Sequence, residues 1–210
     1  MPSPTPNTPP PSQTTPETTY STILSKIDAA HAEDPTKTTL PSGEQIPYEL
    51  LYAQKSTAFL TQRFPPASPA LRLAVRAQHF RRWEVPRSTY PAGRAGYLTW
   101  RAYLKTRQAD LVTALCREHD LPEEVTERVG KLMRKEGLKN DEETQVLEDV
   151  ACLVFLEDQF AEFERAHDEE KIVGILRKTW GKMTARGREM AMGIPMEGRA
   201  REVLRKALAG

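Results

Sequence analysis

A stretch near the middle of the chain, residues 71–107, places one histidine among many cations. Its only acid is Glu84, and its nine basic residues are Arg72, Arg76, Arg81, Arg82, Arg87, Arg94, Arg101, Lys105 and Arg107. Nine minus one gives a local charge of +8, whereas the whole chain carries +1. Arginine offers a planar fork of donors that suits phosphate or carboxylate groups. The stretch therefore predicts a site for an anionic ligand, with a solvated basic face as the alternative.

His79 is the residue of this stretch whose side chain could do acid–base chemistry. It lies near the end of an expected helix, ahead of a Gly/Pro-rich loop, where it could act as a general base or a ligand. A purely structural role is the alternative. We expect the predicted ligand-binding residues to be Gln78, Arg81, Arg82, Trp83, Arg87, Arg94 and Arg101. The aromatic side chains of the stretch could stack on a base or an arginine, or could instead form a core layer.

Two adjacent acids, Glu148 and Asp149, precede a run that is apolar on all sides from residue 150 to residue 156. An unpaired charge beside a buried helix is costly, so each carboxylate needs a partner. The arginines that follow His79 are the obvious partners. We therefore predict His79, Asp149 and Glu148 as the catalytic set, with His79 and Asp149 as ligands of any divalent metal. A structural pair with arginine and simple exposure are the alternatives.

Several function classes are not expected. The chain has no P-loop, GxSxG, HExxH or strand-preceded GxGxxG motif, which argues against P-loop nucleotide hydrolysis and serine-hydrolase chemistry. Cys116 and Cys152 lie in apolar settings without zinc spacing, so we expect reduced core residues. Without an apolar run of about 18 residues or a signal peptide, we expect no membrane association and a cytoplasmic or nuclear location.

The elements that must position these residues are helical. No segment alternates with period two over a strand length, and apolar residues recur with helical spacing, so we predict a single compact all-α domain of about eight helices. Residues 1–18 are rich in Pro, Ser and Thr and should form a disordered arm, which leaves residues 19–210 as the domain. The expected helices cover residues 21–31, 47–64, 69–84, 97–119, 121–137, 141–166, 169–187 and 195–208.

Five runs of the sequence resemble an uncharacterised family known as domain of unknown function 4202. They are IDAAHAEDP (27–35), ELLYAQ (49–54), LRLAVRAQHFRRWEVPRSTYP (71–91), GYLTWR (96–101) and RKEGLKNDEETQVLEDVACLVFLE (134–157). The resemblance extends over residues 20–208 and implies no activity. Family members are sometimes labelled as related to glutamyl-tRNA synthetase. This chain has neither the HIGH nor the KMSKS motif, so an aminoacyl-tRNA synthetase is not expected.

The order of motifs also resembles that of HD-type phosphohydrolases, helical proteins that hold metals with histidines and aspartates. LAVRAQH is similar to the helix before their His-Asp pair, which places His79 on that His, and QVLEDVACL places Asp149 on their final Asp. Phe80 stands where the paired Asp belongs, and residues 52–55 lack the histidine of the first helix. Catalytic metal sites usually need three protein ligands, so a complete binuclear site is not expected.

These observations together predict an HD-like helical protein with an arginine-rich site. Its ligand would be a phosphorylated small molecule or nucleotide, bound around His79 and Asp149, and hydrolysis of a phosphate ester would be compatible with such a site. The alternative is a non-catalytic module that binds RNA or protein.

Overall fold

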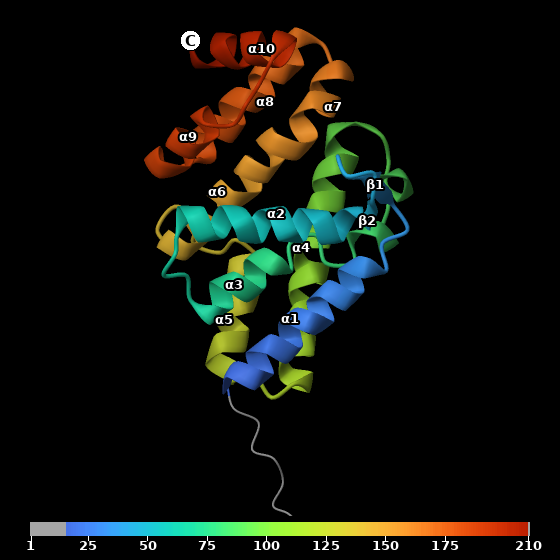
Figure 1. Cartoon of the computed structure of the whole chain (residues 1–210), viewed down its shortest axis with the longest axis vertical. Coiled ribbons are helices and arrows are strands. Elements are labelled where there is room, and N and C mark those ends of the chain that lie inside the picture. Colours follow the sequence, from blue (N-terminus) through green and yellow to red (C-terminus); the bar gives the residue numbers. More distant parts are fainter. Residues whose placement is uncertain (1–15, 210) are drawn as a thin grey trace, which may run out of the picture.

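The computed structural model describes residues 16–209, which form ten α-helices and one small β-hairpin (Figure 1). The prediction of an all-α fold is confirmed, with two more helices than expected. Residues 16–18, which we had assigned to the arm, form the first turn of helix α1. The rest of the expected arm, residues 1–15, lies outside the described residues. No helix in the described part of the chain is long and apolar enough to cross a membrane.

Helix α2 (Tyr48–Arg63) runs across the middle of the molecule (Figure 1). On one side of it lie α1 (Pro16–Ala32), α3 (Pro69–Arg76) and α5 (Glu123–Met133). The other helices are α4 (Gly93–Glu118), α6 (Glu142–Val154), α7 (Phe160–Arg165), α8 (Glu169–Lys182), α9 (Ala185–Met192) and α10 (Gly198–Leu208). Side-chain caps fix several of the helix starts. The Ser68 and Asp168 side chains accept from backbone N–H groups of α3 and α8, and Asp141 caps α6 in the same way.

The β-hairpin was not expected. Strands β1 (Lys37–Thr39) and β2 (Gln45–Pro47) pair antiparallel, with Thr38 opposite Ile46, between the expected helices over residues 21–31 and 47–64. Three residues are too few to display the alternation of polar and apolar residues that identifies a strand.

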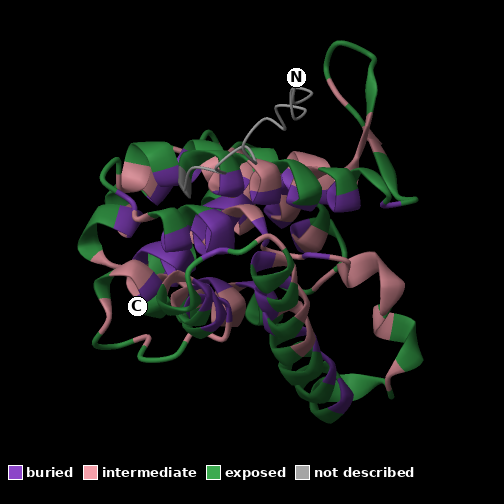
Figure 2. Ribbon diagram, turned by 90° about the horizontal axis from the view of Figure 1, so that it is seen from below, coloured by how far each residue is buried: buried purple, intermediate pink, exposed green. Residues whose placement is uncertain are grey.

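The core lies where α3, α5 and α6 meet beneath α2. Leu71, Leu73 and Val75 of α3 are fully buried, and so are Val150 and Leu153 of α6. The expectation that the middle of α6 is buried on most sides is therefore confirmed. Figure 2 shows the buried residues along the sides of the helices that face one another.

The helix expected over residues 69–84 is eight residues shorter than predicted, because a tertiary contact ends it. In a continuing helix the Arg76 carbonyl would accept the N–H of Phe80. Instead the Nε2–H of His31 donates to that carbonyl (3.0 Å), and the Phe80 N–H donates to the Ala77 carbonyl (3.0 Å). The chain then takes left-handed φ angles at His79 (68°) and Arg81 (51°). Two 3₁₀ turns follow, η1 (Arg82–Glu84) and η2 (Arg87–Thr89).

The helix expected over residues 141–166 is continuous but not uniformly α-helical. A π-helical turn, η3 (Phe155–Gln159), separates α6 from α7. Such a turn accommodates one extra residue and is frequent at functional sites. Here it brings Asp158 and Gln159 to α2, where Asp158 accepts from the Tyr48 hydroxyl (2.8 Å) and from Lys55 (2.6 Å).

Candidate functional site

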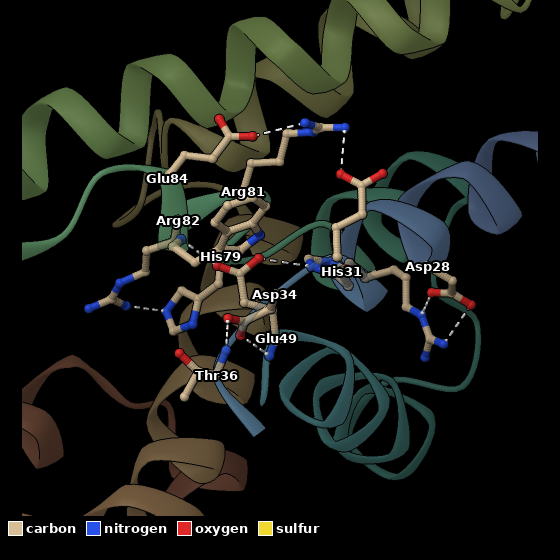
Figure 3. Close-up of polar contacts among 12 residues, drawn as sticks. Asp28, His31, Asp34, Thr36, Glu49, His79, Arg81, Arg82 and Glu84 are labelled. Carbon is tan, nitrogen blue, oxygen red and sulfur yellow. Dashed lines mark hydrogen bonds and ion pairs between the residues drawn. The ribbon is translucent and has the colours of Figure 1, made fainter. Parts of the chain in front are cut away.

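A buried polar network holds the loop that follows α3 (Figure 3). His31 at the end of α1 is fully buried, and its Nδ1 lies 3.3 Å from Oε2 of Glu49. The other carboxylate oxygen of Glu49 accepts from the backbone N–H of Trp83 (2.9 Å). Because His31 also bonds the last carbonyl of α3, these contacts tie α1, α2, α3 and the loop together.

Asp34 completes this network from the turn after α1. One of its carboxylate oxygens accepts from the Glu49 backbone N–H (3.0 Å) and the other from the Thr36 N–H (2.8 Å). Our sequence reasoning did not predict Asp34, Glu49 or His31 as important residues. The available signal was the run HAEDP, in which a histidine and an aspartate stand together before a proline.

His79 packs against α2, and its surroundings keep its ring neutral. The ring stacks on that of Tyr52, with centroids 3.9 Å apart and an interplanar angle of 23°. An N–H of Arg82 donates to Nε2 of His79 (2.7 Å). Because arginine is always the donor, Nε2 must be unprotonated and the ring proton must lie on Nδ1. Burial lowers the pKa of His79 well below its ordinary value, and the charges of Arg82 and Arg101 lower it further.

Arg82 is a half-buried cation without an acid. Its guanidinium lies over the indole of Trp100, 4.7 Å from the ring centroid, and bonds His79. Among residues 16–209 it forms no ion pair with a carboxylate. Burial lowers the pKa of Arg82, and the neighbouring charge of Arg101 lowers it further. Arg101 is exposed, lies over the Tyr97 ring at 6.0 Å, and likewise has no carboxylate partner in the described part of the chain.

The other predicted arginines near this loop differ in their partners. Arg81 pairs with acids, Arg87 bonds backbone carbonyls, and Arg94 makes no polar contact with the described residues. Arg81 pairs with Glu84 (2.8 Å) and with Glu33 (3.3 Å), so acids of the protein neutralise its charge. Arg87 donates to the backbone carbonyls of Tyr90, Pro91 and Gly93 and thereby closes the loop on itself. Arg94 is exposed and makes no polar contact with the residues that the structure describes.

Gln78 and Trp83 each bury a polar nitrogen beside this cluster. Neither Nε2 of Gln78 nor Nε1 of Trp83 has a hydrogen-bond partner among residues 16–209. Both residues belonged to the predicted ligand-binding set. They are two donors for which the folded chain supplies no acceptor.

The two predicted carboxylates pair with residues other than the arginines after His79. Glu148 pairs with Lys135 and with Lys182 (3.3 Å). Asp149 is fully buried and accepts from Arg63 (2.8 Å) and from both the N–H (2.8 Å) and the hydroxyl (2.5 Å) of Thr184.

Asp149 and His79 are not in contact. Arg63, the partner of Asp149, lies eleven residues after Tyr52 on α2, which is about 16 Å along the helix axis at 1.5 Å per residue. Asp149 therefore ties the end of α2 to the start of α9, while His79 lies near the beginning of α2. Of the predicted site residues, the structure brings together His79, Arg82 and Arg101, and it adds Tyr52 and Trp100.

No group of three or more His, Cys, Asp or Glu side chains in the described residues is arranged to hold a metal ion. Burial and the nearby charges of Arg82 and Arg101 lower the pKa of His79, and Arg82 occupies its Nε2. A metal held by His79 and Asp149 thus stays a prediction, with no supporting contact between the two.

Comparisons with known proteins place the chain in a family without assigning it an activity. Searches of curated proteins and of solved structures returned no match, so the resemblance to HD-type phosphohydrolases is not confirmed. The model of the family described as a domain of unknown function, DUF4202, matches residues 21–204. That match covers most of the chain, and the protein therefore belongs to the DUF4202 family.

Proposed function

We propose that the protein binds a phosphorylated small molecule or nucleotide at a basic cluster formed by His79, Arg82 and Arg101. The observation that carries this proposal is the half-buried guanidinium of Arg82, which lacks an acid partner among residues 16–209. Two other half-buried arginines, on α2 and α3, do have acid partners. Arg63 pairs with Asp149 and Arg76 forms a two-pronged pair with Asp28, at 2.6 and 2.8 Å.

An anion would relieve an unfavourable arrangement of charge. Two guanidinium groups near each other repel, and partial burial of Arg82 weakens its screening by water. A phosphate group between them would accept charge-assisted hydrogen bonds from both forks. Arg101 is exposed and Arg82 is half-buried, so the cluster is accessible from solvent on one side.

The aromatic residues of the cluster suit a nucleotide. Trp100 contacts the Arg82 guanidinium through a cation–π interaction. Tyr97, beside Arg101, is 44% exposed, and its ring offers a face on which a base can stack. A nucleoside phosphate would thus meet both a cation pair and an aromatic surface.

Hydrolysis of a phosphate ester at this site would require a change in the partners of His79. A general base needs a free ring nitrogen within reach of the attacking water. Nε2 of His79 accepts from Arg82, and Nδ1 carries the proton. If Arg82 turned to a bound phosphate, Nε2 would become free to accept a proton.

Calorimetric titration with nucleoside phosphates and sugar phosphates tests the proposal. We expect at least one of these ligands to bind, and Arg82→Ala and Arg101→Ala each to weaken binding at least about tenfold, since a hydrogen bond between charged groups contributes about 1.5–3 kcal/mol. Arg186→Ala is the matched control, because Arg186 is exposed on α9 and, among residues 16–209, pairs only with Glu189. Equal affinities for the wild type and the Arg82→Ala variant would contradict the proposal.

A further inference from the structure

The outer face of α4 carries cations and exposed aromatic and aliphatic side chains but no acid. Residues 85–109 contain neither Asp nor Glu. Residues three and four apart share one face of a helix. This face, the α4 stripe, consists of Arg94, Tyr97, Leu98, Arg101 and Lys105, all of them exposed. Its three cations make no ion pair within the part of the chain that the structure describes.

Buried residues along one flank of the α4 stripe fix it in place. Gly96, Trp100 and Leu104 are buried, and the Trp100 indole N–H donates to the Val85 carbonyl (2.9 Å). A Cβ at Gly96 would overlap the Pro91 carbonyl, so the helix packs against the loop at van der Waals distance. The stripe is therefore part of a rigid element that faces solvent.

The stripe is longer than a single phosphate group can cover. Arg94 and Lys105 are eleven residues apart, about 16 Å along the axis. A single phosphate between Arg82 and Arg101 would leave the other two cations without a counter-charge. A ligand with several phosphates in a row would engage all of them.

Exposed Tyr97 and Leu98 between the cations indicate which polyanion fits. These residues are 44% and 54% exposed, respectively. Proteins that bind single-stranded nucleic acid combine a positively charged track for the backbone with aromatic side chains on which bases stack. A duplex keeps its bases stacked on each other and would leave Tyr97 without a partner. The net charge of +1 also gives no broad positive field of the kind that binds duplex DNA.

We infer that the protein binds the phosphorylated end of a single-stranded nucleic acid, with the terminal phosphate between Arg82 and Arg101 and the following nucleotides along the α4 stripe. Arg101 belongs both to the terminal-phosphate site and to the α4 stripe. It lies over the Tyr97 ring of the stripe, and its charge is near enough to Arg82 to lower the pKa of that guanidinium. The inference rests on the proposed function for the terminal phosphate, and it adds the chain of nucleotides.

Fluorescence anisotropy with labelled 12-nucleotide RNA and DNA strands, each with and without a 5′-phosphate, tests the inference on the full-length protein. We expect phosphorylated strands to bind and Arg94→Ala/Lys105→Ala to weaken them at least tenfold. Removal of two phosphate contacts should make the plot of log affinity against log salt shallower by about 1.4, at about 0.7 per contact for single strands. Tyr97→Ala should also weaken binding, through the lost stacking.

The matched control is Lys178→Ala/Arg201→Ala, which removes the same charge from exposed residues of α8 and α10 that have no ion pair among residues 16–209. It should leave strand binding unchanged. Tighter binding of RNA or of DNA would identify which nucleic acid the protein binds. Equal binding of both would mean that the protein recognises phosphates and bases. Either result supports the inference.

The two proposals fail in different ways. If mononucleotides bind in an Arg82-dependent manner while strands bind the wild type and Arg94→Ala/Lys105→Ala equally or not at all, the inference is wrong and the proposed function stands. If no phosphorylated ligand of any length binds, both are wrong. If vesicles containing phosphatidylserine bind through Arg94 and Lys105 while strands do not, the stripe is a membrane surface and the inference is overturned.

Discussion

At the scale of single residues, the arginines of the basic stretch fall into two groups. Some form ion pairs that stabilise the fold, and others have no acid partner among the described residues and could bind a ligand. Arg76 and Arg81 pair with acids that lie outside the basic stretch, and Arg107 pairs with Glu84. Arg82 and Arg101 have no such partner among the described residues. The local charge of +8 therefore overstates the predicted anion site, because Asp28 and Glu33, from outside the stretch, offset two of its charges.

His79 gives a prediction about pH. Its pKa is lowered in the folded state, so below the ordinary histidine pKa the unfolded chain binds a proton that the native chain does not. His79 therefore lowers the stability of the wild type as pH falls through about 6.5, by at most about 1.4 kcal/mol per pH unit. We expect His79→Asn, which tolerates a left-handed φ, to lose less stability than the wild type between pH 7.5 and pH 5.

Urea denaturation at the two pH values measures this difference. The other three histidines, at positions 31, 119 and 167, are present in both proteins, so the difference between the two pH dependences isolates His79. Parallel pH dependences would show that His79 titrates normally in the folded protein.

At the scale of the elements, Asp149 connects three helices. It lies on α6, pairs with Arg63 at the end of α2, and accepts from the N–H and hydroxyl of Thr184, the residue that caps α9. Removal of one partner leaves a buried charge without its counter-ion. We expect Asp149→Ala to lower the free energy of unfolding by about 3–5 kcal/mol and to leave nucleotide affinity unchanged below its melting temperature.

Chemical denaturation and calorimetric titration of the same Asp149→Ala sample check both halves of this expectation. Arg63→Ala should reproduce the loss of stability, because it breaks the same pair. A stable Asp149→Ala protein without ligand affinity would place Asp149 in the binding site after all.

The helices themselves could largely be predicted from the sequence, and their irregularities could not. Ser68 and Asp168 mark helix starts by local chemistry that acts within three residues. The end of α3 depends on His31, which is 45 residues away in sequence. A periodicity that continues past residue 76 cannot reveal that contact.

The candidate site was predictable only in part, for the same reason. The basic stretch contains His79, Arg82 and Arg101, which do lie near one another. Tyr52 and Glu49 belong to α2, and no local pattern connects α2 with the loop after α3. The resemblance to HD-type proteins paired His79 with Asp149, whereas in the structure these two residues have separate partners.

At the scale of the whole molecule, helix α10 near the C-terminal end is held by few buried side chains. Helix α10 lies at the outside of the molecule (Figure 1) and buries mainly Val203 and Ala207. Its polar contacts include Lys206 with Glu169 (2.7 Å), a pair whose side chains are 50% and 49% exposed. Exposed ion pairs contribute only about 0–1 kcal/mol.

We therefore expect backbone amides of α10 to exchange with deuterium much sooner than those of α3 and α6, which form the buried centre. Hydrogen–deuterium exchange followed by mass spectrometry would measure the order. Exchange of α10 as slow as that of α6 would mean that the molecule opens as one cooperative unit.

The π-helical turn at residues 155–159 has a consequence for how the sequence can vary in length. One residue advances an α-helix by about 100° around its axis. A deletion within this turn that restored α-helical spacing would rotate α7 and the three helices after it relative to α6, and Asp158 would no longer reach Tyr48. The orientation of the last fifty residues thus depends on the presence of a single residue in this turn, so insertions and deletions should be far less tolerated here than in the β-hairpin loop.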